Sequence, residues 1–161
     1  MASENCYEIV RNSPLSVELT EEQCVLLAKQ VVIRKLKDGE VLLKEGDVDK
    51  NLYLVVSGNL AVTHESGGGD WIVLHVLRPI SLAGELGFLD GLGHSATLRS
   101  IGPTELLSLG RDNLEALLET HPKLVYQVMR AIIRAVHGTL RRMNLQHVEL
   151  SNYVSKQHGR Y

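Results

Sequence analysis

The feature that most constrains the fold is a series of short apolar segments between Val31 and Leu109, separated by turn-forming residues. The apolar segments read VVIRKL, VLL, LYLVV, LAVTH, WIVLHVL, TLRSI and ELLSL. Between them lie KDGE, KEGD, SGN and ESGGGD, whose glycines accept the positive φ of tight turns. Seven or more short strands at such spacing predict a sandwich or barrel. We expect a mainly β fold, a jelly-roll-like barrel of the double-stranded β-helix type, over about residues 31–109.

Helical periodicity replaces this pattern on both sides of the strand region. Thr20 followed by Gln23 resembles a capping box, which predicts that a short helix begins there. After the strands, RDNLEALLETHP predicts another helix, and Pro122 is placed to open the next segment. A long helix is expected from Lys123 to about Val154, because a mostly apolar stripe recurs at Leu124, Val128, Ile132, Val136, Leu140, Met143, His147, Leu150 and Val154. The C-terminal helices therefore cover about residues 111–154.

The apolar stripe of the long helix is wide near its start, where Leu124, Val125, Ile132, Ile133 and Val136 gather. One face of the helix can therefore lie on the barrel while another face meets a second helix. We expect the second helix to come from another copy of the chain, which makes a homodimer. The alternative is that the barrel alone buries the stripe, since a globular helix usually needs only one core.

Length and composition exclude several classes of protein. A chain of 161 residues is the size of one domain, which we place over residues 1–161. Its 17 basic and 19 acidic residues give a net charge of −2, so no chain-wide basic field draws it onto nucleic acid. No apolar run reaches the roughly 18 residues needed to cross a bilayer. The two cysteines lie in a chain with no apolar leader, which favours a reducing, cytoplasmic location.

The titratable residues do not predict an enzyme or a metal centre. The histidines fall in different segments, and none makes an i, i+4 pair with another histidine or with a cysteine on one helix face. No nucleophile motif such as G-x-S-x-G is present, and Glu85 has only Asp90 as a nearby second carboxylate. We expect no catalytic residues, no metal and no cofactor.

One segment of the strand region, LAGELGFLDGLGHSA, has the composition of a ligand-binding loop. Gly84 and Gly87 allow close backbone approach, and GELGFL can form one helical turn whose free N–H groups point at an anion. Ser95 and Ala96 can add donors, while Glu85 can accept hydrogen bonds from a hydroxyl such as that of a ribose. An ordinary surface loop with glycines at its turns explains the same residues equally well, and the loop matches neither the P-loop nor the Rossmann pattern.

The order of three motifs resembles that of the cyclic nucleotide-binding domain shared by the catabolite activator family, cyclic-nucleotide-dependent kinases and some channels. LKDGEVLLKEGDVDKNLYLVVSGNLAV is similar to the family's turns and following strand, LAGELGFLDGLGHSATLRS to its phosphate-binding cassette, and ELLSLGRDNLEALLETHPKL to the strand, helix and proline that follow. The resemblance covers about residues 31–145. It is specific because three separate motifs occur in the family order at plausible spacing.

The resemblance implies which residues meet a ligand. Glu85 would bind the ribose 2′-hydroxyl, and the turn from Gly84 to Gly87 would present N–H groups to the cyclic phosphate. On the long helix, Thr139 lies at about the position where a small hydroxyl residue meets the base. A threonine in the middle of a helix can instead bond back to the preceding turn. The implied set is Gly84, Glu85, Leu86, Gly87, His94, Ser95, Ala96 and Thr139.

His94 is the departure from the family pattern, because it stands where the family has the arginine that binds the phosphate. Arginine offers a permanent charge and a planar fork, whereas a neutral imidazole offers one donor and gains charge only near or below about pH 6.5. Losing a charge-assisted contact costs about 1.5–3 kcal/mol, or about one to two decades of affinity. The nearest other arginine, Arg99, lies on an expected strand, where family members carry a basic residue that does not bind phosphate.

The resemblance therefore implies a regulatory module that binds a cyclic nucleotide, cAMP before cGMP, through a cassette spanning Gly84 to Ala96, and signals through a dimerising C-terminal helix. Ligand would favour one docking of the helix against the barrel over another. The alternative is a degenerate member that does not bind cyclic nucleotides, and that acts as a dimerisation or protein-interaction domain or senses another effector. Transcriptional members continue into a helix-turn-helix domain. Only about ten residues follow the expected helix end here, so we expect no direct DNA binding by this chain and, at most, a downstream protein partner.

Overall fold

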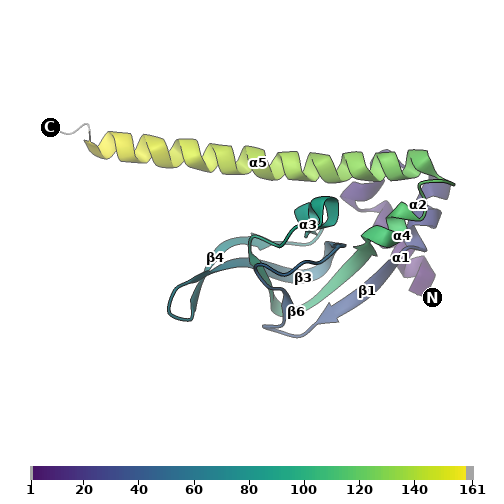
Figure 1. Cartoon of the computed structure of the whole chain (residues 1–161), viewed down its shortest axis with the longest axis horizontal. Helices are drawn as coiled ribbons and strands as arrows, with labels where there is room; N and C mark the ends of the chain where they lie inside the picture. Colours follow the sequence, from purple (N-terminus) through teal and green to yellow (C-terminus); the bar gives the residue numbers. More distant parts are fainter. Residues whose placement is uncertain (1, 159–161) are drawn as a thin grey trace.

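The computed structural model of the protein describes residues 2–158, and the side chains of residues 5–156. The expected domain limits thus include residue 1 and residues 159–161, which lie outside the described residues. Helices precede, interrupt and follow the strands (Figure 1). The helical elements are α1 (Ala2–Arg11), the 3-10 helix η1 (Pro14–Ser16), α2 (Glu21–Ala28), α3 (Glu85–Asp90), α4 (Arg111–Glu115) and α5 (Pro122–His158). The strands are β1 (Val31–Leu36), β2 (Val41–Leu43), β3 (Asn51–Ser66), β4 (Asp70–Leu77), β5 (Leu82–Ala83) and β6 (Thr97–Gly110).

The strands form an antiparallel, jelly-roll-like sheet, as the sequence predicts. They run in the order β1-β6-β3-β4, with β2 added to β6 and β5 added to β3. All of these pairs are antiparallel, and β3 and β6 are the two long strands on which the others are built. The expected mainly β fold with a long C-terminal helix is confirmed.

The number of strands differs from the expectation, because two of the glycine-containing breaks do not end a strand. LYLVV and LAVTH belong to the single strand β3, and TLRSI and ELLSL belong to β6. Gly58 and Gly102, with φ of +78° and +70°, bend these strands where the register shifts. A Cβ on Gly58 would lie 2.5 Å from the backbone oxygen of Pro103. The two strands therefore cross closely at a corner that only glycine fits.

The helices on either side of the sheet begin where their sequence signals predict. In α2, the Gln23 backbone N–H donates to Thr20 Oγ1 at 3.2 Å, and the Thr20 N–H donates to Gln23 Oε1 at 2.9 Å, which is a complete capping box. The helix expected over RDNLEALLETHP is shorter than that segment, since α4 ends at Glu115. Pro122 then starts α5, where its missing N–H costs no hydrogen bond.

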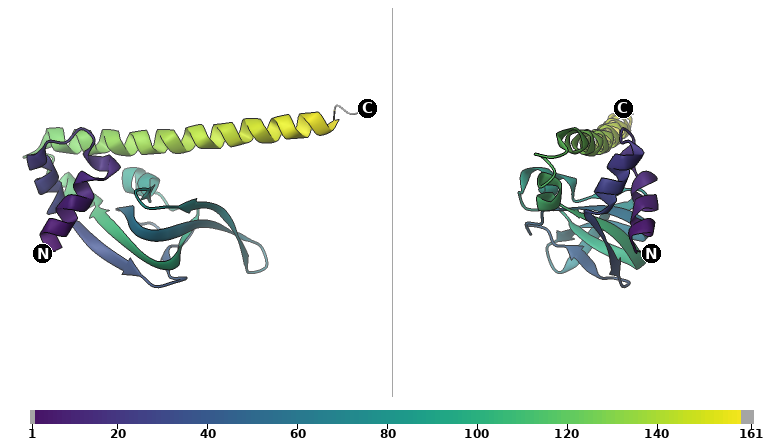
Figure 2. Two further views of the ribbon diagram at one scale, coloured as in Figure 1. Left: turned by 180° about the vertical axis from the view of Figure 1, so that it is seen from behind. Right: turned by 90° about the vertical axis from the view of Figure 1, so that its right-hand side faces the viewer.

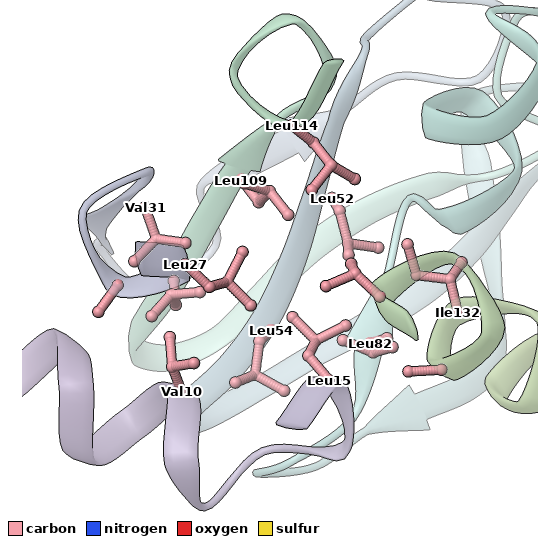
Figure 3. Close-up of a cluster of buried hydrophobic side chains, with 14 of the residues drawn as sticks. Val10, Leu15, Leu27, Val31, Leu52, Leu54, Leu82, Leu109, Leu114 and Ile132 are labelled. Atoms are coloured by element: carbon pink, nitrogen blue, oxygen red, sulfur yellow. The ribbon is translucent and has the colours of Figure 1, made fainter. Parts of the chain in front are cut away.

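The core joins the first half of α5 to the sheet and to the N-terminal helices (Figure 3). On α5 the buried side chains are Leu124, Val125, Val128, Ala131 and Ile132. The other elements contribute, among others, Val10, Leu15, Leu27, Leu52, Leu54 and Leu109. A second cluster fills the barrel interior around Tyr53, Leu60 and Leu106. Burial of these apolar surfaces fixes the first half of α5 against the rest of the fold.

Two ion pairs add to this anchoring. The carboxylate of Glu18 receives Arg130 Nη2 and Arg134 Nη2 from α5, each at 3.3 Å. Beyond this point α5 continues past the sheet and lies above the β3–β4 hairpin (Figures 1 and 2). There the side chains of Leu140, Met143 and Leu150 are 54%, 56% and 61% exposed. Within the described part of the chain, the barrel thus buries only the first half of the stripe.

No helix among the described residues is both long enough and apolar enough to span a bilayer. This includes α5, whose second half combines its apolar stripe with charged and polar side chains.

The corner at Gly58 can be tested with a matched pair of alanine substitutions. Gly39 and Gly58 both have positive φ, but a Cβ on Gly39 would meet nothing within 4 Å. Gly39→Ala should therefore cost only the backbone penalty, about 1–2 kcal/mol. Gly58→Ala should cost about 2–3 kcal/mol more, because its Cβ would strike backbone that cannot rotate away. Urea unfolding of both variants measures the difference, and equal losses would show that the corner is not tightly packed.

Candidate functional site

The cassette begins where β5 passes directly into α3. Gly84 makes this turn with φ +76° and caps the helix, so the expected helical turn in GELGFL is present as α3. A Cβ on Gly84 would lie 3.0 Å from the backbone oxygen of Asn51 and 3.4 Å from the Tyr53 ring. Positive φ and the nearby β3 backbone thus both require glycine here. Figures 1 and 2 show α3 between the sheet and α5.

The loop between β2 and β3 holds the far end of the cassette. The backbone N–H of His94 donates to the Asp47 carbonyl at 2.9 Å, and the Gly46 N–H donates to the His94 carbonyl at 2.8 Å. A Cβ on Gly93 would lie 2.8 Å from the Gly46 oxygen, so the two segments touch backbone to backbone. These contacts fix the backbone of His94 without using its side chain.

Asp49 connects this loop to the barrel interior. Its Oδ1 accepts the N–H and Nδ2 groups of Asn51, both at 2.7 Å, and its Oδ2 accepts the Tyr53 hydroxyl at 2.7 Å. Burial, followed by this contact with Asp49, raises the pKa of the Tyr53 hydroxyl, which therefore remains a donor. A Cβ on Gly87 would lie 3.0 Å from the Asp49 carbonyl oxygen, so the same residue supports α3.

The support that Asp49 gives was not predicted from the sequence. Two signals were available: the D-x-N spacing of Asp49 and Asn51, which is typical of an Asx turn, and the one hydroxyl, Tyr53, inside the apolar run LYLVV. Neither signal identifies α3 as the element that the loop contacts, because that contact joins residues far apart in sequence.

The His94 side chain folds against α3. A Cβ on Gly87 would lie 2.7 Å from His94 Cε1 and 3.1 Å from its Nε2, so the ring occupies space that only a glycine leaves. The Nε2 atom is buried and has no hydrogen-bond partner among the described residues. A buried polar atom left unpaired costs about 1–3 kcal/mol, so this nitrogen gains from any partner that reaches it.

Glu85, the first residue of α3, is half-buried. Burial raises the pKa of its carboxyl, while its own backbone N–H and the charge of Arg142 on α5 act in the opposite direction. A hydroxyl donor beside this carboxylate would replace part of the hydration that burial removes. The site therefore combines an acceptor at Glu85 with an unpaired imidazole nitrogen at His94.

The other residues of the implied set differ in their contacts and exposure. Gly84 packs against the backbone of β3, and Gly87 packs against the His94 ring and the Asp49 carbonyl. The side chains of Leu86 and Ser95 are exposed, and Ala96 is half-buried. Thr139 stands on α5, where its Oγ1 donates to the Ala135 carbonyl at 3.2 Å, which is the bond to the preceding helical turn. The structure thus brings Gly87 and His94 of the cassette together, and the hydroxyl of Thr139 is engaged within its own helix.

Arg99 makes its contacts elsewhere. Its guanidinium stacks on Trp71 of β4, 5.0 Å from the ring centroid, and its Nη1 lies 3.5 Å from the Gly39 carbonyl oxygen. These contacts occupy the arginine nearest to His94 in the sequence.

Over the described residues, no group of three or more His, Cys, Asp or Glu side chains is arranged to hold a metal ion.

Comparisons with known proteins agree with this fold. Residues 33–121 match the profile of the family described as "Cyclic nucleotide-binding domain". The "Cyclic AMP receptor protein" of Thermus thermophilus is 30% identical over 125 residues, which are 78% of this chain and 58% of that protein. The chain thus spans little more than half the length of this relative.

Two solved structures share the fold. A cyclic nucleotide-binding domain from Methylobacillus flagellatus superposes with a TM-score of 0.76 at 25% identity, covering 87% of this chain and 79% of that one. The regulatory domain of Toxoplasma gondii PKA, crystallised with cAMP, superposes with a TM-score of 0.62 at 31% identity, covering 71% and 43%. On the profile match and the fold together, the chain belongs to the cyclic nucleotide-binding domain family.

Proposed function

We propose that the chain is a regulatory module that binds a cyclic nucleotide, cAMP before cGMP, between the cassette and α5. The observation that carries this proposal is the buried and unpaired Nε2 of His94, which lies against the glycine of the cassette helix. Family membership supports the same ligand class, as do the Thermus relative named for cyclic AMP and the Toxoplasma domain crystallised with it.

Each cassette residue has a role that suits its surroundings. Glu85 accepts the ribose 2′-hydroxyl, which offsets the loss of hydration that raises its pKa. The backbone of Gly84, Leu86 and Gly87 lines the cyclic phosphate. His94 donates to a phosphate oxygen through Nε2, in the tautomer or protonation state that places a proton there.

The remaining residues close the pocket on its other sides. The backbone N–H groups of Ser95 and Ala96 add donors to the phosphate. On α5, the Thr139 hydroxyl exchanges its bond to Ala135 for one to the base. That exchange gains little by itself, because one hydrogen bond replaces another.

The module passes its signal through α5 and a second copy of the chain. Leu140, Met143, His147, Leu150 and Val154 are spaced alternately three and four residues apart, which is the repeat of a coiled-coil seam. Leu140, Met143 and Leu150 are more than half exposed, so these three seam positions are available to a partner helix. Ligand between the cassette and α5 then favours one orientation of the helix in the dimer.

Calorimetry with cAMP and cGMP at pH 8 tests ligand binding, using the wild type, His94→Arg and His94→Ala. His94→Arg should bind about tenfold to a hundredfold more tightly than the wild type, because a guanidinium offers the phosphate a permanent charge and a planar fork. His94→Ala should bind more weakly than the wild type, because it removes the donor at Nε2.

If the wild type gives no heat with millimolar ligand, the protein is the degenerate form that does not bind cyclic nucleotides. If His94→Arg gains no affinity, residue 94 does not face the phosphate.

Sedimentation equilibrium tests the dimer. Met143→Glu places a charge in the seam and should convert the dimer to monomer. Leu145→Glu is the matched control, because Leu145 is also exposed and apolar. Leu145 lies two residues after Met143, so its side chain projects from the opposite side of the helix. The control should remain dimeric. A wild type that is monomeric at all concentrations, or equal effects of the two substitutions, would contradict dimerisation through this seam.

A further inference from the structure

Charged and titratable side chains from three parts of the chain act on one another electrostatically. They are Glu85 at the start of α3, His75 on β4, Arg78 just after β4, and Arg142 on α5. The charge of Arg142 acts on both Glu85 and His75, and Arg78 also acts on His75. The ribbon views show that α5 passes over both α3 and the β3–β4 hairpin, the elements that carry or adjoin these residues (Figures 1 and 2).

The register of α5 directs Arg142 toward the barrel side. Arg142 follows Leu124 by 18 residues, which is five turns at 3.6 residues per turn, so the two side chains project in the same direction. Leu124 is almost fully buried against the fold. Arg141, by contrast, repeats the direction of Lys123, which is exposed. Thr139 lies three residues before Arg142 and shares its side of the helix.

The charges in this group do not balance. Arg78, Arg142 and His75 are bases, and Glu85 is the one carboxylate in the group. Arg78 and Arg142 make no ion pair within 4.0 Å to any of the described residues, unlike Arg130 and Arg134 at the anchored end of the helix. An anion between α3 and α5 would therefore meet an arginine whose charge no carboxylate neutralises by direct contact.

We propose that Arg142 supplies the permanent positive charge for the ligand's phosphate, in place of the arginine that His94 replaces. This inference rests on the proposed binding of a cyclic nucleotide. In this arrangement the phosphate is held from two sides, by the neutral or charged imidazole of His94 on the cassette and by a guanidinium on α5. The ligand thus bridges barrel and helix through its charged group.

A positive charge supplied by α5 couples ligand binding to the position of the helix. An arginine on the cassette would strengthen binding without involving the helix, whereas Arg142 contacts the ligand only when α5 lies close to α3. Part of the binding free energy then depends on the position of the helix, and by linkage the ligand shifts the helix toward that position.

The first test compares cAMP binding by the wild type, Arg142→Gln, Arg141→Gln and Arg142→Lys in calorimetry. Arg142→Gln should weaken binding about tenfold to a hundredfold, because it removes a charge-assisted contact. Arg141→Gln, which removes the same charge from the neighbouring position, should change affinity less than about threefold. Arg142→Lys keeps the positive charge but loses the planar, two-donor geometry of the guanidinium, so its affinity for cAMP should lie between those of the wild type and Arg142→Gln. Equal effects of Arg141→Gln and Arg142→Gln would overturn the proposal, since the helix would then act only through its overall charge.

The second test needs no ligand. Burial, Arg142 and Arg78 all lower the pKa of His75, so removing the positive charge at position 142 should raise it. An NMR titration of His75 in Arg142→Gln should show this increase, and Arg141→Gln should show little. An unchanged His75 titration in Arg142→Gln would overturn the grouping of these side chains, and with it the proposal, while leaving cyclic nucleotide binding intact. Absence of binding by the wild type would instead remove the proposed function and this inference together.

Discussion

The site depends on a pair of backbone hydrogen bonds between the β2–β3 loop and the cassette, in which His94 exchanges N–H and C=O contacts with Asp47 and Gly46. These bonds hold the far end of the cassette through backbone groups alone. Asp49 extends the same support inward to the Tyr53 hydroxyl and, through its carbonyl, to the packing of α3 at Gly87. Because backbone groups carry the arrangement, this part of the cassette frame does not depend on which side chain stands at position 94.

In the proposed arrangement, α5 contacts the ligand with one of its sides and a second copy of the chain with another. The side that includes Leu124 and Arg142 faces the fold, and the seam of Leu140, Met143 and Leu150 lies on a different side. Contact with ligand and contact with a second copy therefore need not compete for the same side chains. The Glu18 ion pairs and the buried residues near Ile132 hold the first half of the helix in place. Under the proposed function, a change in the second half of α5 is thus the more accessible response to ligand.

The local signals in the sequence predict local structure well, and long-range contacts less well. The capping box at Thr20, the turn at Gly84 and the proline that opens α5 act through neighbours in the chain, and each was predictable. The continuity of β3 through Gly58 was not, because a glycine at a strand corner and a glycine in a turn look alike until the crossing strand is known. The same limit applies to Asp49 and Arg142. Asp49 matters because α3 packs against it, and the proposed role of Arg142 depends on α3 lying across from it. Both residues are far from α3 in the sequence, so no periodic pattern reveals either relation.

The uneven support of α5 also turns the helix into a lever. Its anchoring contacts end near Arg134, and it continues as one helix to His158, which is about 36 Å further at 1.5 Å per residue. Rotation by about 5° around the anchored part would move the far end by about 3 Å, nearly the width of a side-chain contact. A displacement too small to notice at the cassette would therefore be large enough at the other end to make or break packing with whatever lies there.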